Sequence, residues 1–457
     1  MLKPKLIFPS SITGLQRISL LFLPAIMGYE FFIAKKVVAE GERSFARLII
    51  RIAVVAVALS TAVMICSMAL IAGFKKEIST KIFGFWGHIH ITDTELNQTL
   101  LEISPVSIHQ PFYPSLDTVR KVSYPVTENW FGREVERWRE TSGGIRHIQV
   151  FALKPGIIKA NREIEGIILK GMGRDFEWSF MQQYIVAGRP IRMEDSTASD
   201  EILLSRQTAD RLKVKVGDSF RVHFVEKGSQ LQRNFKVCGI FKTGLEEYDR
   251  QFALVDIRKI QQLLGWDQDM VGGFEVFVDN IRDLDPLVDY IYYEQLPSNL
   301  YAETIRQKLP QIFEWLALQD INEVVILALM LIVAIINMIT ALLILILERT
   351  YMIGTLKSLG SSNWSIRKIF LLYAAYIVGL GLFWGNVIGL GLCLIQKYGK
   401  FIRLSEENYY LSVAPIHLNA GHILLLNLGI LSVILLFLIL PSYLVTRISP
   451  IKAIRFK

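Results

Sequence analysis

The sequence predicts an α-helical membrane protein with four transmembrane helices and a large α+β extracytoplasmic domain between helices 1 and 2. Three observations predict this fold class. The chain of 457 residues is 52% hydrophobic with a mean hydropathy of +0.37, which exceeds the usual composition of soluble domains. Its apolar residues concentrate in four long runs, and a polar stretch at 75–320 separates the first two. Lysine and arginine concentrate beside the runs.

Four apolar runs, at 48–74, 324–347, 370–395 and 423–445, are each long enough to cross a bilayer. At ~1.5 Å of rise per residue, a helix of each run exceeds the ~30 Å hydrocarbon core. The alternative for any single run is a buried core helix, but such helices rarely continue past about 20 residues without a charge. Arg51 is the one charge, and it lies near an end from which its head group reaches the interface. The runs are therefore interpreted as transmembrane helices.

The flanking charges predict the orientation, because Lys and Arg in short flanks resist translocation. Residues 28–47, the 348–369 loop and the 446–457 tail hold twelve of them, and the 396–422 loop holds three. Both termini are therefore expected to be cytoplasmic, and 75–320 and the 396–422 loop to face outward. The twelve are Lys35, Lys36, Arg43, Arg47, Arg349, Lys357, Arg367, Lys368, Arg447, Lys452, Arg455 and Lys457, and the three are Lys397, Lys400 and Arg403.

Residues 1–27 match a signal peptide poorly, because Pro24 interrupts the apolar segment and no clear small-residue cleavage site follows. We interpret them as an uncleaved extension, or as residues upstream of a true start near Met27. Residues 28–47 predict an amphipathic helix at the cytoplasmic interface, since apolar side chains alternate with basic ones. Those apolar residues are Phe31, Phe32, Val37, Val38 and Phe45. The alternative is a plain extension of the first transmembrane helix.

The polar stretch mixes two hydrophobic periods, which predicts an α+β domain. Alternation with period two predicts strands at 88–92, 220–224 and 274–278. Helical spacing of apolar residues predicts helices at 205–214, 256–264 and 302–318. An irregular stretch is indicated by Pro105, Pro111, Pro114 and Pro125.

The sequence contains no motif for enzyme chemistry. A G-x-x-x-x-G-K-[ST] phosphate loop is absent, so any ATP that drives the protein would be bound by another subunit. The histidines lack metal-site spacings, and a structural role explains His88 and His90 better. Of three cysteines only Cys238 lies in the polar stretch, which excludes a disulfide framework. We therefore expect a non-catalytic subunit that binds no cofactor or metal directly.

The net charge of +8 does not indicate nucleic-acid binding, because of where the charge lies. The balance of Lys and Arg over Asp and Glu is +5 for 1–74, −4 for 75–320 and +7 for 321–457. A nucleic-acid-binding domain concentrates positive charge on its soluble surface. The polar stretch is mildly acidic, so nucleic acid is not an expected partner.

Two features inside the runs predict contacts between helices. Gly381, Gly385 and Gly389 recur every four residues, a stripe that allows close packing against a neighbouring helix or a partner subunit. Asn337 and Thr340 lie at mid-depth of the second run, where a polar side chain facing lipid would be costly. Interhelical hydrogen bonding is the simpler interpretation, and contact with a substrate is the alternative.

The segment 348–360 reads E-R-T-Y-M-I-G-T-L-K-S-L-G and opens with the pattern of a short amphipathic helix. It resembles the E-R-x-x-x-I-G-x-L-K-x-L-G signature of the permease superfamily that includes the macrolide exporter, the cell-division permease and the lipoprotein-releasing (Lol) permeases. The tail at 441–455 is similar to that superfamily's P-x-x-x-A-x-x-x-x-P-x-x-A-L-R ending, with Val445 in place of the first Ala. The resemblance implies a coupling helix that docks on an ABC ATPase, with Glu348, Arg349, Ile353, Gly354, Leu356, Leu359 and Gly360 in the motif.

The N-terminal half resembles the Lol branch. F-I-A-K-K at 32–36, G-F-K-K-E-I at 73–78 and G-H-I-H-I at 87–91 are similar to the start of Lol permeases, and the resemblance covers 28–457. One departure concerns the long hook with which a Lol permease recruits the periplasmic carrier. The matching hairpin at 226–234 is short and has no proline, so docking of the carrier on this chain stays open. The residues of this reduced hairpin are Glu226, Lys227, Gly228, Ser229 and Gln230.

The resemblance implies the permease subunit of an ATP-driven transporter in the bacterial inner membrane, which extracts lipoproteins from the outer leaflet for delivery to the outer membrane. Expected partners are a separate, dimeric ABC ATPase, a second permease copy or a related permease, the lipoprotein substrate and a periplasmic carrier. The family places the acyl-chain cleft on the first two transmembrane helices, where we assign Met64, Met68, Met330, Met338 and Asn337.

Two alternatives remain from the same superfamily. The first is a non-transporting signal relay of the division-permease type, which activates a cell-wall hydrolase. Its outer domain is usually much smaller than 75–320. The second is a macrolide-type exporter, which normally carries an ATPase fused ahead of the first transmembrane helix.

Overall fold

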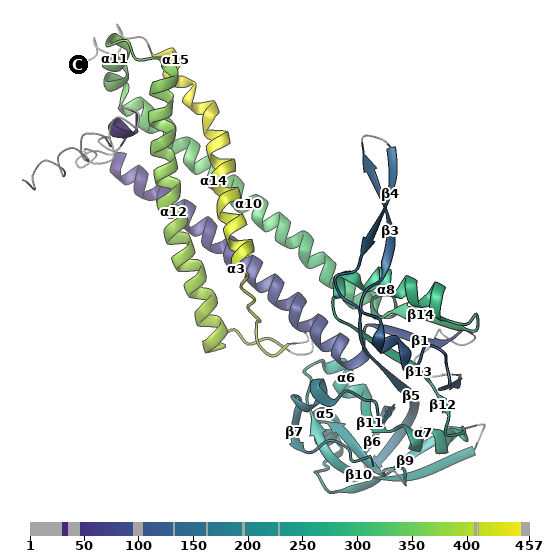
Figure 1. Cartoon of the computed structure of the whole chain (residues 1–457). Coiled ribbons are helices and arrows are strands. Elements are labelled where there is room, and N and C mark those ends of the chain that lie inside the picture. The colour runs from purple at the N-terminus through teal and green to yellow at the C-terminus, as the bar shows by residue number, and fades with distance from the viewer. Residues whose placement is uncertain are drawn as a thin grey trace, which may run out of the picture. The chain divides into compact units, whose positions relative to one another are not determined.

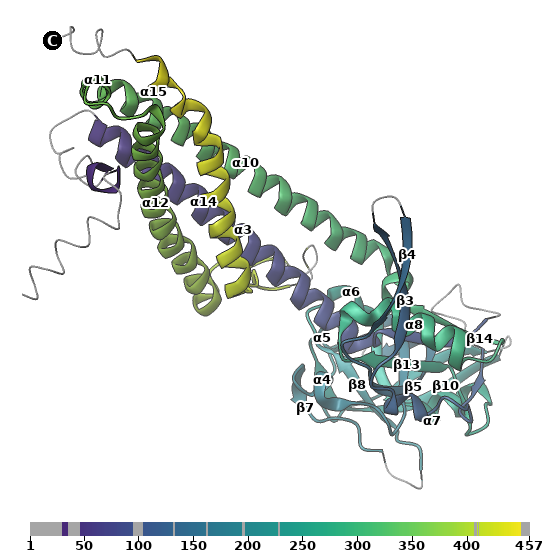
Figure 2. The same ribbon diagram turned by 45° about the horizontal axis from the view of Figure 1, so that its top comes forward.

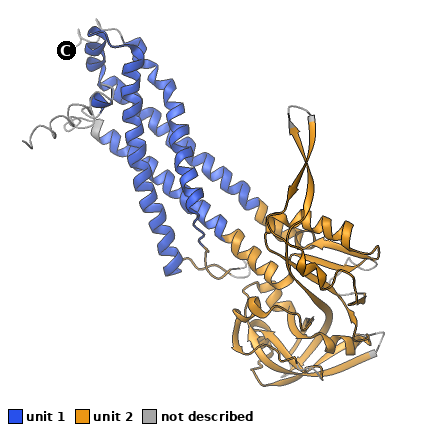
Figure 3. Ribbon diagram, viewed as in Figure 1, with its two compact units in different colours: residues 1–73, 318–401, 416–457 blue, residues 74–317, 402–415 orange. Residues whose placement is uncertain are grey.

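The computed structural model describes residues 30–34, 46–94, 104–130, 133–160, 163–193, 197–226, 229–405, 409 and 411–448. The chain divides into two compact units (Figure 3). Unit 1 comprises 1–73, 318–401 and 416–457, and unit 2 comprises 74–317 and 402–415. Most of the expected interfacial helix at 28–47 and the extension at 1–27 lie outside the described residues.

Long helices make up unit 1 (Figure 1). Among the described residues, four helices are long and apolar enough to cross a membrane, at 48–86, 310–348, 363–399 and 420–447. Each contains one of the predicted runs and extends beyond it at one or both ends, because the helical hydrogen bonds continue past the apolar residues. Unit 1 contains α11 Thr350–Ser358, α12 Asn363–Gly399, α14 Ala420–Ser442 and α15 Leu444–Arg447, together with the larger parts of α3 Ala46–Trp86 and α10 Pro310–Glu348.

A mixed ten-stranded sheet forms the centre of unit 2, with strand order β14-β1-β13-β5-β6-β11-β8-β10-β7 and with β9 paired to both β10 and β5. The β6–β11 and β8–β10 pairs are parallel. The strands are β1 Ile89–Asp93, β5 Ile145–Ala160, β6 Glu163–Met172, β7 Ile185–Gly188, β8 Glu201–Ser205, β9 Ser219–Glu226, β10 Ser229–Phe241, β11 Phe252–Asp256, β13 Gly273–Val278 and β14 Leu300–Thr304.

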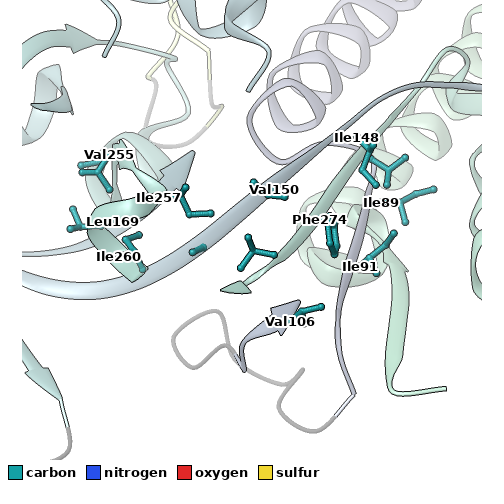
Figure 4. Packing of buried hydrophobic residues seen from close by; sticks show 14 of the residues in the cluster. Ile89, Ile91, Val106, Ile148, Val150, Leu169, Val255, Ile257, Ile260 and Phe274 are labelled. Carbon is teal, nitrogen blue, oxygen red and sulfur yellow. The ribbon is translucent and has the colours of Figure 1, made fainter. Parts of the chain in front are cut away.

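Short helices cover the sheet, and their apolar faces complete its core. In Figure 4, Ile257 and Ile260 of α7 lie near Leu169 of β6 and Val255 of β11. Phe274 of β13 lies among β-branched residues of β1 and β5 in the same cluster. The helices are α4 Trp178–Gln182, α5 Arg206–Leu212, α6 Glu246–Gln251, α7 Ile257–Leu264, α8 Leu284–Tyr290 and α9 Ile305–Lys308, and a small sheet pairs β2 Val106–Ser107 with β12 Met270–Val271.

Several local predictions in this unit are confirmed, and two are wrong. The three predicted strands fall on β1, β9 and β13, and two of the predicted helices fall on α5 and α7. The helix predicted at 302–318 is wrong at its start, because β14 occupies Leu300–Thr304 with alternating burial. A capping box between Thr304 and Gln307 then starts α9. The irregular stretch also ends before Pro125, which lies inside a strand of an edge hairpin, where a proline removes no sheet hydrogen bond.

That hairpin pairs β3 Ser123–Trp130 with β4 Arg133–Glu140 as a separate two-stranded sheet that projects from unit 2 (Figure 2). Directly paired residues share a face, so the register sorts the side chains by charge. One face carries Arg137 and Arg139, which both approach Glu128. The other face carries Trp138, 71% exposed, among three glutamates, Glu134, Glu136 and Glu140.

The segment between α12 and α14 joins unit 2 in part. Residues 402–415 belong to that unit, and Leu411 is buried in the cluster that contains the end of α3. The ring of Tyr409 lies 6.4 Å from that of Phe74. The predicted 396–422 loop is therefore partly a structural piece of unit 2.

Candidate functional site

The helix α11 follows α10 after a single residue and carries most of the 348–360 motif. Arg349 is its N-cap residue, directly after Glu348, the last residue of α10. Beyond the helix, Gly360 has φ +89°, a left-handed conformation that favours glycine. The N–H groups of Gly360 and Ser361 donate to the carbonyls of Lys357 and Leu356, at 3.0 Å each. The motif glycine therefore ends α11 because of its backbone conformation.

One side of α11 packs into the core of unit 1. Ile353 is fully buried, Gly354 is also buried, and Leu356 packs against the same cluster. That cluster includes Ile366 and Phe370 of α12. These three motif residues therefore hold the helix in place and are not free to contact a partner.

Lys357 joins α11 to the C-terminal end of α15. Its ammonium donates hydrogen bonds to the carbonyls of Val445 at 2.8 Å, Thr446 at 3.3 Å and Ile448 at 2.7 Å. Carbonyls at a helix C-terminus lack helical partners and carry partial negative charge, so an ammonium is a favourable partner. Burial lowers the pKa of Lys357. The sequence analysis left this residue out of the site, although the K of the motif marks its position.

The opposite side of α11 is open. Leu359 is 77% exposed and Tyr351 is 54% exposed, and Glu348 is exposed as well. Arg349 is half-buried at the start of the helix. These apolar side chains belong to a helix whose other side is packed in the core, and charged residues lie beside them. Such a surface is typical of a protein–protein contact. We call Tyr351 of α11, together with Glu348 before the helix and Leu359 after it, the outer face of α11.

The glycine stripe of α12 lies against α3. A Cβ built on Gly381 would lie 2.6 Å from Val57 Cγ1, one on Gly385 2.8 Å from the carbonyl oxygen of Ala58, and one on Gly389 3.0 Å from Ala62 Cα. Real Cβ atoms essentially never approach as closely as those at Gly381 and Gly385 would, and the contact at Gly389 would be tight, so the two helices pack at distances that favour glycine. The neighbour of the stripe is thus a helix of the same chain.

The methionines assigned to a cleft do not share one environment. Met64 and Met338 are fully buried in the unit 1 cluster, and Met330 packs against it. Met68 and Asn337 are half-buried, whereas Thr340 is exposed and donates to the carbonyl of Ile336 at 3.0 Å. Two of the four methionines therefore face other helices in this structure, and their contact with substrate stays a prediction.

The reduced hairpin extends further along its strands than 226–234. Strands β9 and β10 pair continuously from Glu226 with Ser229 to Ser219 with Lys236, and Gln230 pairs with Val225. Lys227 and Gly228 lie outside the described residues. The hairpin is also joined to the main sheet, since β9 pairs with β5 at 157–159.

A buried polar cluster surrounds the end of α3 inside unit 2. The Lys170 ammonium donates to the carbonyl of Phe85 at 2.5 Å and pairs with Glu275 Oε1 at 2.6 Å. Gln149 donates to the other Glu275 oxygen at 2.8 Å, and His90 Nε2 lies 2.6 Å from the carbonyl of Trp86. We call Lys170, Glu275, Gln149 and His90 the α3 end cluster.

All four side chains of this cluster are at most 1% exposed. Burial lowers the pKa of Lys170 and raises that of Glu275, and their mutual attraction opposes both shifts. Burial also holds the pKa of His90 well below its usual range, so this ring is neutral. The cluster joins strands β1, β5, β6 and β13 to the last turn of α3, which fixes this helix to the sheet.

Two family models match successive parts of the chain. A model of the MacB-like periplasmic core domain matches residues 52–291, which is more than half of the chain. A model of the FtsX-like permease C-terminal region matches 324–450, which includes α11. The chain belongs to the MacB and FtsX superfamily of ABC-transporter permeases, and it is similar to lipoprotein-releasing permeases over most of its length.

The curated relatives are similar along nearly the whole chain. LolC, a lipoprotein-releasing system transmembrane protein of Xylella fastidiosa, is 21% identical over 92% of this chain and 96% of its own length. LolC of Neisseria meningitidis is 22% identical over 95% and 99%. LolE of Haemophilus influenzae is 21% identical over 88% and 93%. Together with its apolar helices, these relatives make the chain a multi-pass inner-membrane permease subunit.

Proposed function

We propose that this chain is the permease subunit of an ATP-driven transporter that extracts lipoproteins from the outer leaflet of the inner membrane for delivery to the outer membrane. The observation that carries the proposal is α11, a helix packed by Ile353 and fixed by Lys357, which presents an exposed apolar face. The relatives named as lipoprotein-releasing proteins support the substrate class.

ATP is bound and hydrolysed in a separate ATPase that contacts the outer face of α11. A displacement of α11 reaches α10 and α12 through its buried side, and reaches the end of α15 through Lys357. Both α3 and α10 are continuous helices with residues in each unit. Movement of these two helices is then the means by which unit 2 responds to the ATPase.

The acyl chains of the substrate contact the first two transmembrane helices at Met64, Met68, Met330 and Met338. Each buried methylene contributes ~0.8 kcal/mol, so an apolar surface of flexible thioethers suits lipid chains of varied shape. Because Met64 and Met338 are buried within unit 1, α3 and α10 must separate before these two can bind lipid. A photo-crosslinker at Met64 should capture lipoprotein only in cells whose ATPase partner is active, and one at the exposed Leu59 should not capture it at all.

The function is tested in proteoliposomes that hold the assembled complex and a lipoprotein with a fluorescent label. ATP should cause release of the lipoprotein to an added carrier, and a non-hydrolysable analogue should not. If the complex releases no lipoprotein and instead activates a cell-wall hydrolase when ATP is added, the transporter function is wrong and the signal relay is supported.

The proposed orientation has its own test. Both termini are cytoplasmic, and unit 2 faces outward with a second permease copy or a related permease beside it. In a variant without native cysteines, an impermeant maleimide applied outside should label Cys at Gln230 and miss Cys at Ser361. Labelling of Ser361→Cys would reverse the orientation.

A further inference from the structure

A groove of about 480 Å³ runs between α12 and α14, outside the sites described above. Seven of its nine lining residues are apolar, and the other two are Lys368 and Ser432. On α12 it is lined by Trp364, Lys368, Leu371, Leu372 and Ala375, and on α14 by Ser432, Leu435, Leu436 and Ile439.

The length of the groove matches one leaflet of a bilayer. The lining residues of α12 lie on one stripe of the helix, from 364 to 375. Eleven steps of ~1.5 Å give a groove of roughly 16 Å, about half of the ~30 Å hydrocarbon core. An acyl chain of a single leaflet therefore fits along it, whereas a complete transmembrane helix would extend past it.

One end of the groove carries a free cation. Lys368 is exposed, and its ammonium lies 6.0 Å from the Trp364 ring without a hydrogen bond or ion pair to any residue that the structure describes. Its neighbour Arg367 is different, because it is buried and donates to Ser442 Oγ at 3.1 Å and to the carbonyl of Ile439 at 3.4 Å. Arg367 thus holds the two walls together, and Lys368 remains available to a ligand.

We propose that this groove binds an anionic glycerophospholipid, with one acyl chain along the leucines and the phosphate at Lys368. Basic pockets between transmembrane helices take anionic lipid head groups, and tryptophan is enriched at the interface where head groups lie. Among the residues that the structure describes, no carboxylate pairs with Lys368, so an occupant that encloses its ammonium has to supply the counter-charge, as a lipid phosphate does. The proposal requires that α12 and α14 cross the membrane, and it does not depend on the lipoprotein function.

The test is native mass spectrometry of the full chain, equilibrated with phosphatidylglycerol or phosphatidylcholine in equal amounts. The wild-type chain should retain one phosphatidylglycerol in at least tenfold preference. Lys368→Gln should reduce the preference to near unity, and Lys368→Arg should keep it. Leu372→Trp should block retention of either lipid by filling the groove, and Lys397→Gln, which removes a charge from the far end of α12, should change nothing.

Equal preference in the wild type and in Lys368→Gln would overturn the proposal. A photo-crosslinker at Leu436, which is 63% exposed, extends the test to native membranes. Capture of phospholipid supports the lipid site, and capture of a protein helix in place of lipid overturns it.

Discussion

Two lysines, one in each unit, bind carbonyl oxygens at the end of a helix, yet their surroundings differ. Lys170 in unit 2 is 1% exposed and pairs with a carboxylate as well as with the last turn of α3. Lys357 in unit 1 is half-buried and binds three carbonyls at the C-terminal end of α15. A buried pair fixes a fold, because removal of either partner leaves an unpaired charge. A half-buried ammonium with water nearby can change partners at low cost.

The difference indicates separate roles for the two contacts. The α3 end cluster is required for unit 2 to hold the helix that enters it. The Lys357 contact connects a helix with an open outer face to the end of α15, and its half-buried position allows its partners to change. Substitutions at the two sites should therefore separate loss of stability from loss of coupling.

The largest expected effect is on stability at the α3 end cluster. Lys170→Met leaves Glu275 buried without its cation and should lower the free energy of unfolding by about 3–5 kcal/mol. Thermal unfolding of the full chain in detergent, followed by tryptophan fluorescence, measures this loss. Glu275→Gln in the same chain should recover much of it, because no buried charge then remains. If Lys170→Met is as stable as the wild type, the claim that Lys170 stabilises the fold more than Lys357 does is wrong.

A smaller effect on stability comes from pH at the same end of α3. Burial, with Arg146 and Arg306, lowers the pKa of His88 to about 3, and its Nδ1 accepts a hydrogen bond from the Val278 N–H at 3.3 Å. The unfolded chain binds this proton near pH 6.5. The stability from neutral His88 is thus complete above pH 6.5 and is lost as the pH falls toward 3.

In His88→Gln the unfolding temperature should fall less steeply between pH 6.5 and pH 4 than in the wild type. Some dependence should remain, because His90 is also buried and neutral. Identical slopes in the two proteins would show that His88 binds its proton over the same pH range in the folded chain as in the unfolded chain.

Substitution of Lys357 should separate stability from coupling. Lys357→Met should lower the free energy of unfolding by only on the order of 1 kcal/mol, since water replaces part of the lost contact. Stimulation of the partner ATPase by lipoprotein should nevertheless fall several-fold. Both are measured on the assembled complex, with Lys357→Arg as the variant that keeps the charge. A loss of stability as large as that of Lys170→Met would show that the two lysines have the same role.

The smallest effect on stability is expected at the outer face of α11. Leu359→Glu changes an exposed side chain, so the free energy of unfolding should stay within about 0.5 kcal/mol. Co-purification of the ATPase should be lost, because a charge enters an apolar contact. Tyr398→Glu, at an equally exposed residue near the end of α12, is the control and should retain the ATPase. Retention of the ATPase by Leu359→Glu would place its contact elsewhere.

The parts of the fold that could be predicted from sequence depend on local patterns. A run of apolar residues or an alternation such as that at 274–278 is complete within one segment, so the long helices and β13 could be recognised. The sequence does not reveal β14, because the helical spacing of apolar residues that predicts a helix at 302–318 begins within this strand.

The candidate site could be predicted from the sequence only at α11, where the 348–360 motif identifies it. The motif gave α11, but it could not show which of its residues are exposed, because exposure depends on packing against α12. The acceptors of Lys357 are main-chain carbonyls 88 to 91 positions away. Because every residue has such a carbonyl, the sequence cannot show which ones accept these hydrogen bonds. The pairing of Lys170 with Glu275 joins strands that meet only in the folded sheet.

The two faces of the β3–β4 hairpin carry opposite charges, so the hairpin should prefer one orientation near a charged surface. A surface of negative phosphate groups attracts the face with Arg137 and Arg139 and repels the face with the three glutamates. Near such a surface the hairpin would turn the exposed Trp138 toward the water. The attraction acts over ~10 Å at 0.1 M salt and shortens to ~3 Å at 1 M. A higher salt concentration should therefore weaken the preference of the hairpin for this orientation.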